Sequence, residues 1–204
     1  TVTLGAIAKG SGMIHPNMGT MLCFITTDCA ITHEMLEDAL RSVVKHTFNR
    51  VTIDGDTSTN DMCVVLANGM AENALIEWKD AGYSAFYAAL ETLCTNLSRQ
   101  IAADGEGASR LVSCTVTGAR GEDVAERLAK SVVGSSLVKA AMFGADANWG
   151  RVLCAIGYTP GDFDISKTSV RLKSKAGEVF VCENAAYHPY SEDEAAKVLK
   201  EDEI

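Results

Sequence analysis

Residues 20–27, with the sequence TMLCFITT, form an apolar run that directly follows a glycine-rich loop. Its length, its β-branched and aromatic residues and the loop before it predict a strand. In residues 33–48, which come soon after, large apolar side chains recur with helical spacing and predict an amphipathic helix. A strand followed by a helix that covers it is a unit from which layered folds are built.

Further segments extend this pattern along the chain. We predict strands at residues 1–8, 51–54, 62–67 and 111–117, helices at 84–103, 122–133 and 191–200, and a hairpin of residues 168–172 and 179–182 around a turn at 175–177. The type of the apolar stretch at 149–158 stays open. Strands that alternate with helices indicate an α/β or α+β fold with layers of sheet and helix.

The composition is that of a globular protein. The chain has 204 residues, 47% hydrophobic and 22% charged, and we expect one domain or one large piece of a domain. Its 27 acidic and 18 basic residues give a net charge of -9, which argues against nucleic acid or an anionic membrane as partner. No apolar run in the sequence approaches the roughly 20 residues of a membrane-spanning helix.

The seven cysteines are scattered singly, without a Cys-x-x-Cys pair or a histidine at zinc-binding spacing. We expect them to be reduced and mostly buried, as in a cytoplasmic protein. The four histidines also match no ligand spacing, so the sequence predicts no metal site.

Thr20 is the candidate nucleophile. It stands where the loop meets the predicted strand, directly after Gly19, whose missing side chain lets a hydroxyl approach the Gly19 carbonyl carbon. Attack there would shift the acyl chain from nitrogen to oxygen, and hydrolysis of the ester would leave Thr20 as a new N-terminus. Such a residue carries its own base, because an α-amino group has a pKa of about 7.7 to 8.0. From this pair alone, a loop threonine without a catalytic role is the alternative.

Four blocks of sequence add to the local chemistry. They are residues 9–22 (KGSGMIHPNMGTML), 54–61 (DGDTSTND), 104–109 (DGEGAS) and 144–151 (GADANWGR). In content and order they resemble blocks of the ornithine acetyltransferase, or glutamate N-acetyltransferase, family, and the resemblance covers essentially the whole chain. It implies the layered α+β fold of self-cleaving ornithine acetyltransferases and related aminopeptidases.

The resemblance also implies a cut between Gly19 and Thr20. Residues 1–19 would be the C-terminal end of an α chain, including the self-cleavage loop, and residues 20–204 a β chain truncated at its C-terminus. The family's oxyanion-stabilising Thr-Gly pair would lie upstream of this sequence, and further substrate contacts downstream of it. We therefore expect the missing α-chain segment of the same gene product as a partner, in an α2β2 heterotetramer.

The chemistry implied by the resemblance is a ping-pong acetyl transfer in arginine biosynthesis. Thr20 would take acetyl from N2-acetyl-L-ornithine and pass it to L-glutamate, with no cofactor. Acetyl-CoA is a second donor in some members, and the sequence leaves its use open. Matching positions assign substrate contacts to Lys9, for a carboxylate, and Glu106, for an amino group.

Two other functions remain as alternatives. The same threonine device serves N-terminal nucleophile amidases and self-cleaving aminopeptidases, in which water resolves the acyl-enzyme. A non-catalytic binding module would keep the Gly19–Thr20 peptide intact.

Two of the blocks also have structural interpretations. The polar loop 54–61 can cap turns or fix the loop beside the cleavage site, and we favour capping. In block 144–151 we predict that Asn148 caps a helix, that Trp149 anchors it, and that Arg151 is a structural ion-pair partner rather than a catalyst.

Overall fold

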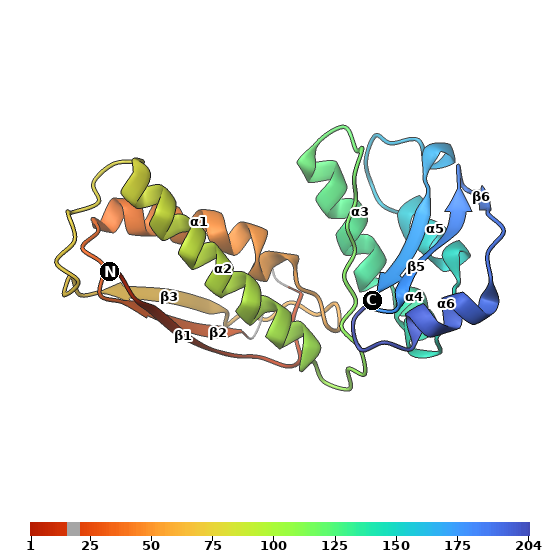
Figure 1. Ribbon diagram of the computed structural model, residues 1–204, viewed down its shortest axis with the longest axis horizontal. Helices are drawn as coiled ribbons and strands as arrows, with labels where there is room; N and C mark the ends of the chain where they lie inside the picture. Colours follow the sequence, from red (N-terminus) through yellow and green to blue (C-terminus); the bar gives the residue numbers. More distant parts are fainter. Residues whose placement is uncertain (16–20) are drawn as a thin grey trace. The chain divides into compact units, whose positions relative to one another are not determined.

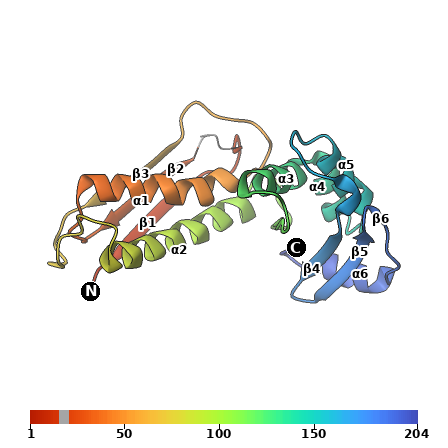
Figure 2. The same cartoon turned by 90° about the horizontal axis from the view of Figure 1, so that it is seen from above.

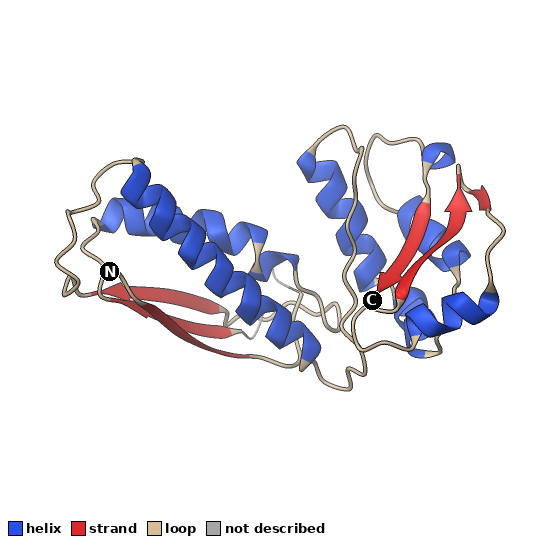
Figure 3. Ribbon diagram, viewed as in Figure 1, coloured by secondary structure: helices blue, strands red, loops and turns tan. Residues whose placement is uncertain are grey.

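The computed structural model describes residues 1–15 and 21–204 (Figure 1). They form two compact units, unit 1 over Thr1–Glu106 and unit 2 over Gly107–Ile204. Each unit combines helices with a three-stranded sheet (Figure 3), so the fold is α+β, as the sequence predicts. The sequence predicts one domain or one large piece of a domain, and it does not predict this division. The boundary falls in a short glycine-containing stretch that no shift in composition marks.

The sheet of unit 1 consists of three strands whose order in the sheet is their order in the chain. They are β1 (Leu4–Lys9), β2 (Leu22–Thr27) and β3 (Met62–Ala67). β1 runs antiparallel to β2, with Lys9 opposite Leu22, and β2 runs parallel to β3, with Leu22 opposite Met62. The end of β1 and the starts of β2 and β3 therefore lie at the same end of the sheet.

Two helices, α1 (His33–His46) and α2 (Ala81–Ala103), lie over one face of this sheet (Figures 1 and 2). Thr32 caps α1, because its side chain accepts a hydrogen bond from the Met35 N–H at 3.4 Å. Asp80 caps α2 in the same way, through the Tyr83 N–H at 2.9 Å. A short 3-10 turn, η1 (Phe48–Arg50), follows α1. Both predicted helices of this unit are confirmed.

The core of unit 1 lies between the sheet and these helices. Alternate residues of β2, Cys23 and Ile25, are fully buried and pack in one cluster with Val43 of α1 and with Leu90 and Cys94 of α2. This is the half-buried strand pattern expected when helices cover one face of a sheet.

The opposite face of the same sheet carries apolar side chains that no other element of unit 1 covers. Ile7 is 70% exposed, Phe24 44% and Leu66 61%, one from each strand. Ile7 and Phe24 are direct partners across the β1–β2 pair, so these side chains form a patch rather than scattered exposures.

Unit 2 contains the remaining helices and strands of the described residues. They are α3 (Glu122–Gly134), α4 (Ser136–Phe143), α5 (Trp149–Gly157), η2 (Ile165–Lys167), β4 (Val170–Ser174), β5 (Gly177–Glu183), β6 (Ala186–Tyr187) and α6 (Glu192–Leu199). The helix α5 settles the open type of residues 149–158, and the predicted helices at 122–133 and 191–200 are confirmed. The structure adds α4, which the sequence analysis does not predict.

The predicted hairpin of unit 2 is also confirmed. β4 and β5 pair antiparallel, and Ser174 lies opposite Gly177, which leaves residues 175 and 176 as the turn. The faces of the hairpin differ in character. Val170, Leu172, Val179 and Val181 are buried in the core cluster of the unit. Arg171, Lys173 and Glu178 are exposed on the other face.

Two predicted strands are wrong. Residues 51–54 join no sheet, although the Ile53 N–H donates to the Ile14 carbonyl at 2.7 Å. Of residues 111–117, only Leu111 forms an isolated bridge, with Glu203. Both segments have apolar side chains in strand-like alternation, but no described strand lies beside them to complete a ladder of hydrogen bonds.

Among the helices of the described residues, none has the length and apolar character needed to cross a membrane.

Candidate functional site

Lys9 is the last residue of β1, and its side chain is exposed. Its backbone partner in the sheet is Leu22, the first residue of β2. The antiparallel register therefore brings Lys9 beside the part of the chain that follows the predicted cleavage point. Gly19 and Thr20 themselves lie outside the described residues, so their predicted roles stay predictions.

Glu106 reaches the same end of unit 1 from a distant part of the sequence. It follows the C-terminal end of α2, and its backbone N–H donates to the Ser11 carbonyl at 2.6 Å. A β-carbon built on Gly12 would lie 2.8 Å from Glu106 Oε2, so the carboxylate lies against the bare backbone of Gly12. A side chain at position 12 would force Glu106 to move. The structure thus brings together the segments that carry Lys9 and Glu106.

The polar loop 54–61 contacts the same region. The Thr57 hydroxyl donates to the His15 carbonyl at 3.0 Å, and His15 Nδ1 lies 2.9 Å from Thr52 Oγ1. The loop also caps itself, since the Asn60 N–H donates to Ser58 Oγ at 3.2 Å. Capping, the favoured interpretation, therefore describes only part of its structure, because the loop also holds residues near the predicted cleavage site.

The two aspartates at the ends of this loop accept backbone hydrogen bonds and have opposite pKa shifts. Burial by itself would raise the pKa of Asp54, but backbone N–H donors, those of Met13 and Ile14 among them, outweigh it and hold that pKa below its usual value. For Asp61, burial prevails over the single N–H donated by Met21, and its pKa is raised. This end of unit 1 therefore combines one exposed lysine with several carboxylates, a charge pattern suited to a small zwitterionic ligand.

Of the seven cysteines only Cys154 is exposed, and several of the others are poor candidates for a nucleophile because they are buried. Cys23, Cys29, Cys94 and Cys182 are buried. Burial raises the pKa of Cys94 to about 12 and that of Cys114 to about 11, which keeps these thiols protonated and unreactive at neutral pH. Within the described residues, no group of three or more His, Cys, Asp or Glu side chains is arranged to hold a metal ion.

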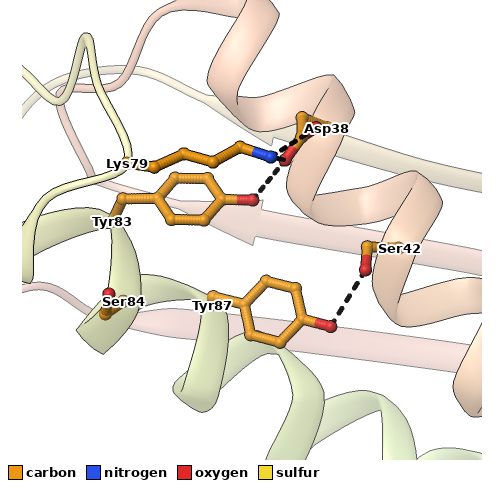
Figure 4. A pocket seen from close by; sticks show the side chains of 6 residues that line it. All are labelled: Asp38, Ser42, Lys79, Tyr83, Ser84 and Tyr87. Carbon is orange, nitrogen blue, oxygen red and sulfur yellow. Dashed lines mark hydrogen bonds and ion pairs between the residues drawn. The ribbon is translucent and has the colours of Figure 1, made fainter.

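A pocket of about 340 Å³ lies between α1 and α2, away from the predicted site residues (Figure 4). Its polar groups bind one another. The Tyr83 hydroxyl donates to Asp38 at 2.5 Å, Lys79 Nζ lies 2.8 Å from the same carboxylate, and the hydroxyls of Ser42 and Tyr87 are 3.1 Å apart. A hydrogen bond from Lys79, which has the larger effect, and one from Tyr83 lower the pKa of Asp38. We interpret this cluster as an interhelix contact that joins α1 to α2.

The block 144–151 belongs to unit 2 and is structural in the way the sequence predicts. The Asn148 side chain accepts from the Arg151 N–H at 3.2 Å and caps α5. Trp149 packs partly buried against the core. Arg151 differs from its prediction, because its guanidinium donates to the Leu137 carbonyl at 3.0 Å and forms no ion pair with a described residue.

Comparisons with known proteins agree with this architecture. The model of the ArgJ family matches residues 1–204. The arginine biosynthesis bifunctional protein ArgJ of Caldanaerobacter subterraneus subsp. tengcongensis is 49% identical over 203 residues, which cover 100% of this chain and 50% of that protein. The ArgJ protein of Geobacillus kaustophilus is 47% identical, with 100% and 49% covered. This chain therefore belongs to the ArgJ family and spans about half the length of these relatives.

A solved structure supports the same assignment. The crystal structure of the arginine biosynthesis bifunctional protein argJ from Bacillus halodurans matches with a TM-score of 0.82 and 44% sequence identity. The match covers 88% of this chain and 83% of that one. The chain in that crystal is thus close in length to this one, whereas the curated relatives are about twice as long.

Proposed function

We propose that this chain carries the nucleophile of a self-cleaving acetyltransferase that moves acetyl from N2-acetyl-L-ornithine to L-glutamate. One observation carries the proposal. In a chain that matches the ArgJ family over its whole length, Lys9, the start of β2 and Glu106 converge at one end of unit 1. Gly19 and Thr20 directly precede Met21 and β2 in the sequence.

The proposed reaction has two steps on Thr20. Its hydroxyl oxygen attacks the acetyl carbonyl of the donor, its proton passes to the free α-amine, and the donor nitrogen leaves as the amine of ornithine with a proton. The amine of glutamate then attacks the acetyl ester, and the threonine oxygen leaves and regains its proton. In each half the free α-amine first takes a proton from the attacking group, the Thr20 hydroxyl and then the glutamate amine, and gives it to the leaving group, the ornithine nitrogen and then the Thr20 oxygen.

Self-cleavage would create that amine. The Thr20 hydroxyl attacks the Gly19 carbonyl, the peptide C–N bond breaks, and the nitrogen becomes the amino group of the β chain. Water then hydrolyses the Gly19 ester. A cut in the middle of the gene product would leave chains of about half its length. The matched chain of the solved relative is close in length to this one, and the curated relatives are about twice as long, which supports such a cut.

The sheet of unit 1 explains how the two pieces would stay together. After the cut, β1 belongs to the α chain and β2 to the β chain, yet the two strands pair from Leu4 opposite Thr27 to Lys9 opposite Leu22. Lys9 would therefore keep its place beside the new N-terminus. In the proposed site Lys9 binds a substrate carboxylate and Glu106 a substrate amino group.

The exposed apolar face of unit 1 fits the expected partner. Relatives are about twice as long as this chain, and the patch of Ile7, Phe24 and Leu66 offers a surface on which the rest of the gene product can pack. We assign this surface to the missing α-chain segment, which would also supply the oxyanion-stabilising groups. An α2β2 assembly in the cytoplasm, with acetyl-CoA as an additional candidate donor, completes the proposal.

The second candidate function is hydrolysis by an N-terminal nucleophile amidase or aminopeptidase. It uses the same threonine and the same acyl-enzyme, and differs only in whether water or an amine resolves the ester. The names of the matched relatives, arginine biosynthesis bifunctional proteins, favour transfer.

The test uses the full-length gene product and its Thr20→Ala variant. We expect two fragments, cut between Gly19 and Thr20, from the wild type and one intact chain from the variant, whose acetyl transfer should fall by more than about 1,000-fold. Initial rates with both substrates should give parallel double-reciprocal lines, because the donor product leaves before glutamate binds. Cleavage of the alanine variant would refute the self-cleavage, and acetate release without glutamate would favour the hydrolase.

A further inference from the structure

The polar loop 54–61 holds the flanks of the predicted cleavage segment at both of its ends. On the upstream flank, Asp54 Oδ2 accepts from the Met13 N–H at 2.5 Å, and Asp54 Oδ1 accepts from the Ile14 N–H at 3.1 Å. The main chain adds the bond from the Ile53 N–H to the Ile14 carbonyl at 2.7 Å. This flank is thus tied to the start of the loop by a carboxylate and by backbone.

The downstream flank is tied in the same manner to the other end of the loop. Asp61 Oδ1 accepts from the Met21 N–H at 2.6 Å, and the Met62 N–H donates to the Met21 carbonyl at 2.8 Å. The nitrogen of Met21 belongs to the peptide bond that joins it to Thr20. The Asp61 carboxylate therefore binds the peptide group immediately after the predicted nucleophile.

The upstream anchor also holds an unfavourable backbone. Met13 has φ of 55°, in the left-handed region that residues with a side chain rarely adopt. Such a conformation persists where the surroundings impose it. The Met13 N–H donates to Asp54 at 2.5 Å, and Ile14, the next residue, is only 1% exposed, so this part of the chain is held from both sides.

We infer that Asp54 and Asp61 are positioning residues for the self-cleavage, each fixing one flank of the segment that contains the Gly19–Thr20 bond. This inference rests on the proposed function and names two groups that its chemistry needs. An intramolecular attack gains its rate from holding the reacting atoms close and aligned. Anchors on both sides of residues 15–20 supply that restraint through the flanking backbone.

The two anchors have different consequences after the cut, because they hold different pieces. Asp61 stays bound to the strand that begins at the new N-terminus, so it would orient the threonine for acetyl transfer. Asp54 stays bound to the piece that ends at Gly19, beside the Gly12 backbone that Glu106 also contacts. Loss of Asp61 should therefore lower kcat, and loss of Asp54 should mainly raise KM.

The experiment follows the cleavage of the full-length product over time. We compare Asp61→Ala, Asp61→Asn, Asp54→Ala and Asp54→Asn with Asp56→Ala, the matched control. The Asp56 carboxylate makes no hydrogen bond or ion pair with a described residue, so its loss removes the same charge from the same loop. Hydrogen exchange of peptides from α1 and α2 shows whether each variant keeps the native fold of unit 1.

We expect Asp61→Ala to slow cleavage about tenfold or more and Asp54→Ala, whose side chain is more exposed, about threefold. Asp61→Asn should cleave faster than Asp61→Ala, because an amide oxygen can still accept from the Met21 N–H. Asp56→Ala should cleave at the wild-type rate. If Asp61→Ala fails to fold, the Asp54 pair makes the same comparison on the other flank.

The outcomes separate this inference from the proposed function. Wild-type cleavage rates in both alanine variants, with Thr20→Ala uncleaved, would overturn the anchors and leave the nucleophile in place. If Asp56→Ala slowed cleavage as much as Asp61→Ala, or if Asp61→Asn cleaved no faster than Asp61→Ala, the charge of the loop and not hydrogen-bond acceptance would matter. Either result would also overturn the anchoring roles of Asp54 and Asp61. Cleavage of Thr20→Ala would instead refute the proposed function.

Discussion

The two sheets of this protein bury one face each and differ in the other. In unit 1 the outward face carries Ile7, Phe24 and Leu66, all well exposed. In unit 2 the outward face of the hairpin carries charge, and Arg171 pairs with Glu178 at 3.0 Å and stacks on the Phe180 ring at 4.2 Å. A charged face is stable in water, whereas an apolar one gains free energy when something covers it. The outward face of unit 1 would therefore gain free energy from being covered, and the outward face of the unit 2 hairpin would not.

The same division holds for the candidate site. Lys9, Asp54, Asp61 and Glu106 all belong to unit 1, and three of them bind its backbone or lie against it. The family block of unit 2, residues 144–151, caps a helix and supports its core. All the site residues that we propose therefore belong to unit 1, and the described contacts of block 144–151 in unit 2 are a helix cap and core packing.

The largest expected effect tests the open face. Leu66→Asp should weaken the association between this chain and the α-chain segment by about 3 kcal/mol or more, because a leucine loses its apolar cover and a charge is buried. The urea concentration at which the two pieces of the processed protein separate would measure this. Leu137→Asp, at a 52% exposed leucine of unit 2, is the control and should have no effect. If Leu66→Asp and Leu137→Asp weakened the association equally, the apolar face of unit 1 would not be the surface that binds the α-chain segment.

The next effect concerns substrate binding in unit 1. Glu106→Gln keeps the size of the side chain but removes its charge, at a cost of about 1.5 to 3 kcal/mol if it pairs with a substrate amine. Catalytic efficiency should fall about tenfold to hundredfold, while self-cleavage continues. Steady-state kinetics would show this, with Glu194→Gln in unit 2 as the charge-matched control. Uncleaved protein, or unchanged efficiency, would make Glu106 a processing or helix-end residue.

A smaller effect is expected in unit 2. Asn148→Ala removes the cap of α5 and should destabilise this unit by about 1 kcal/mol, whereas Asn148→Asp should keep the cap. Thermal unfolding followed by the fluorescence of the adjacent Trp149 would measure the change. The kinetic constants should stay unchanged. A tenfold loss of activity in a folded Asn148→Ala variant would place block 144–151 in the active site and contradict our assignment of chemistry to unit 1.

The smallest effect is a dependence of unit 1 on pH. Since the pKa of Asp54 is lower in the folded protein, its stabilisation is present above the unfolded value of about 3.9 and is lost as the pH falls below it. For Asp61, with a raised pKa, the stabilisation is present below that value and lost as the pH rises. Each contribution should be less than about 1 kcal/mol, because both groups are partly exposed.

Hydrogen exchange in unit 1 would measure this dependence between about pH 3 and pH 6. Asp54→Asn should reduce the loss of protection on acidification, and Asp61→Asn should reduce the loss as the pH rises. Peptides of unit 2 should respond to neither variant. If both variants changed the pH dependence of protection in the same direction, the assigned pKa shifts would be wrong.

Much of the secondary structure could be predicted because it depends on local signals. The helical spacing in residues 33–48 and the turn at residues 175–177 follow from neighbouring residues, and the structure confirms α1 and the hairpin. The predicted strands at 51–54 and 111–117 fail because a strand needs a partner, which alternation alone cannot supply. The division into two units was also hidden, since nothing in the composition changes at Glu106.

The sequence by itself determined the family blocks, the candidate nucleophile Thr20 and the candidate contacts Lys9 and Glu106, because residue types and their order carry that information. Only the tertiary structure decided that Glu106 lies against Gly12. It also decided that Asp54 and Asp61 bind the backbone on the two sides of the predicted cleavage segment. The sequence signal for these two contacts was that the polar loop 54–61 begins and ends with an aspartate. Their partners lie about 40 residues away in the chain, and such contacts follow from strand pairing and chain packing rather than from local sequence.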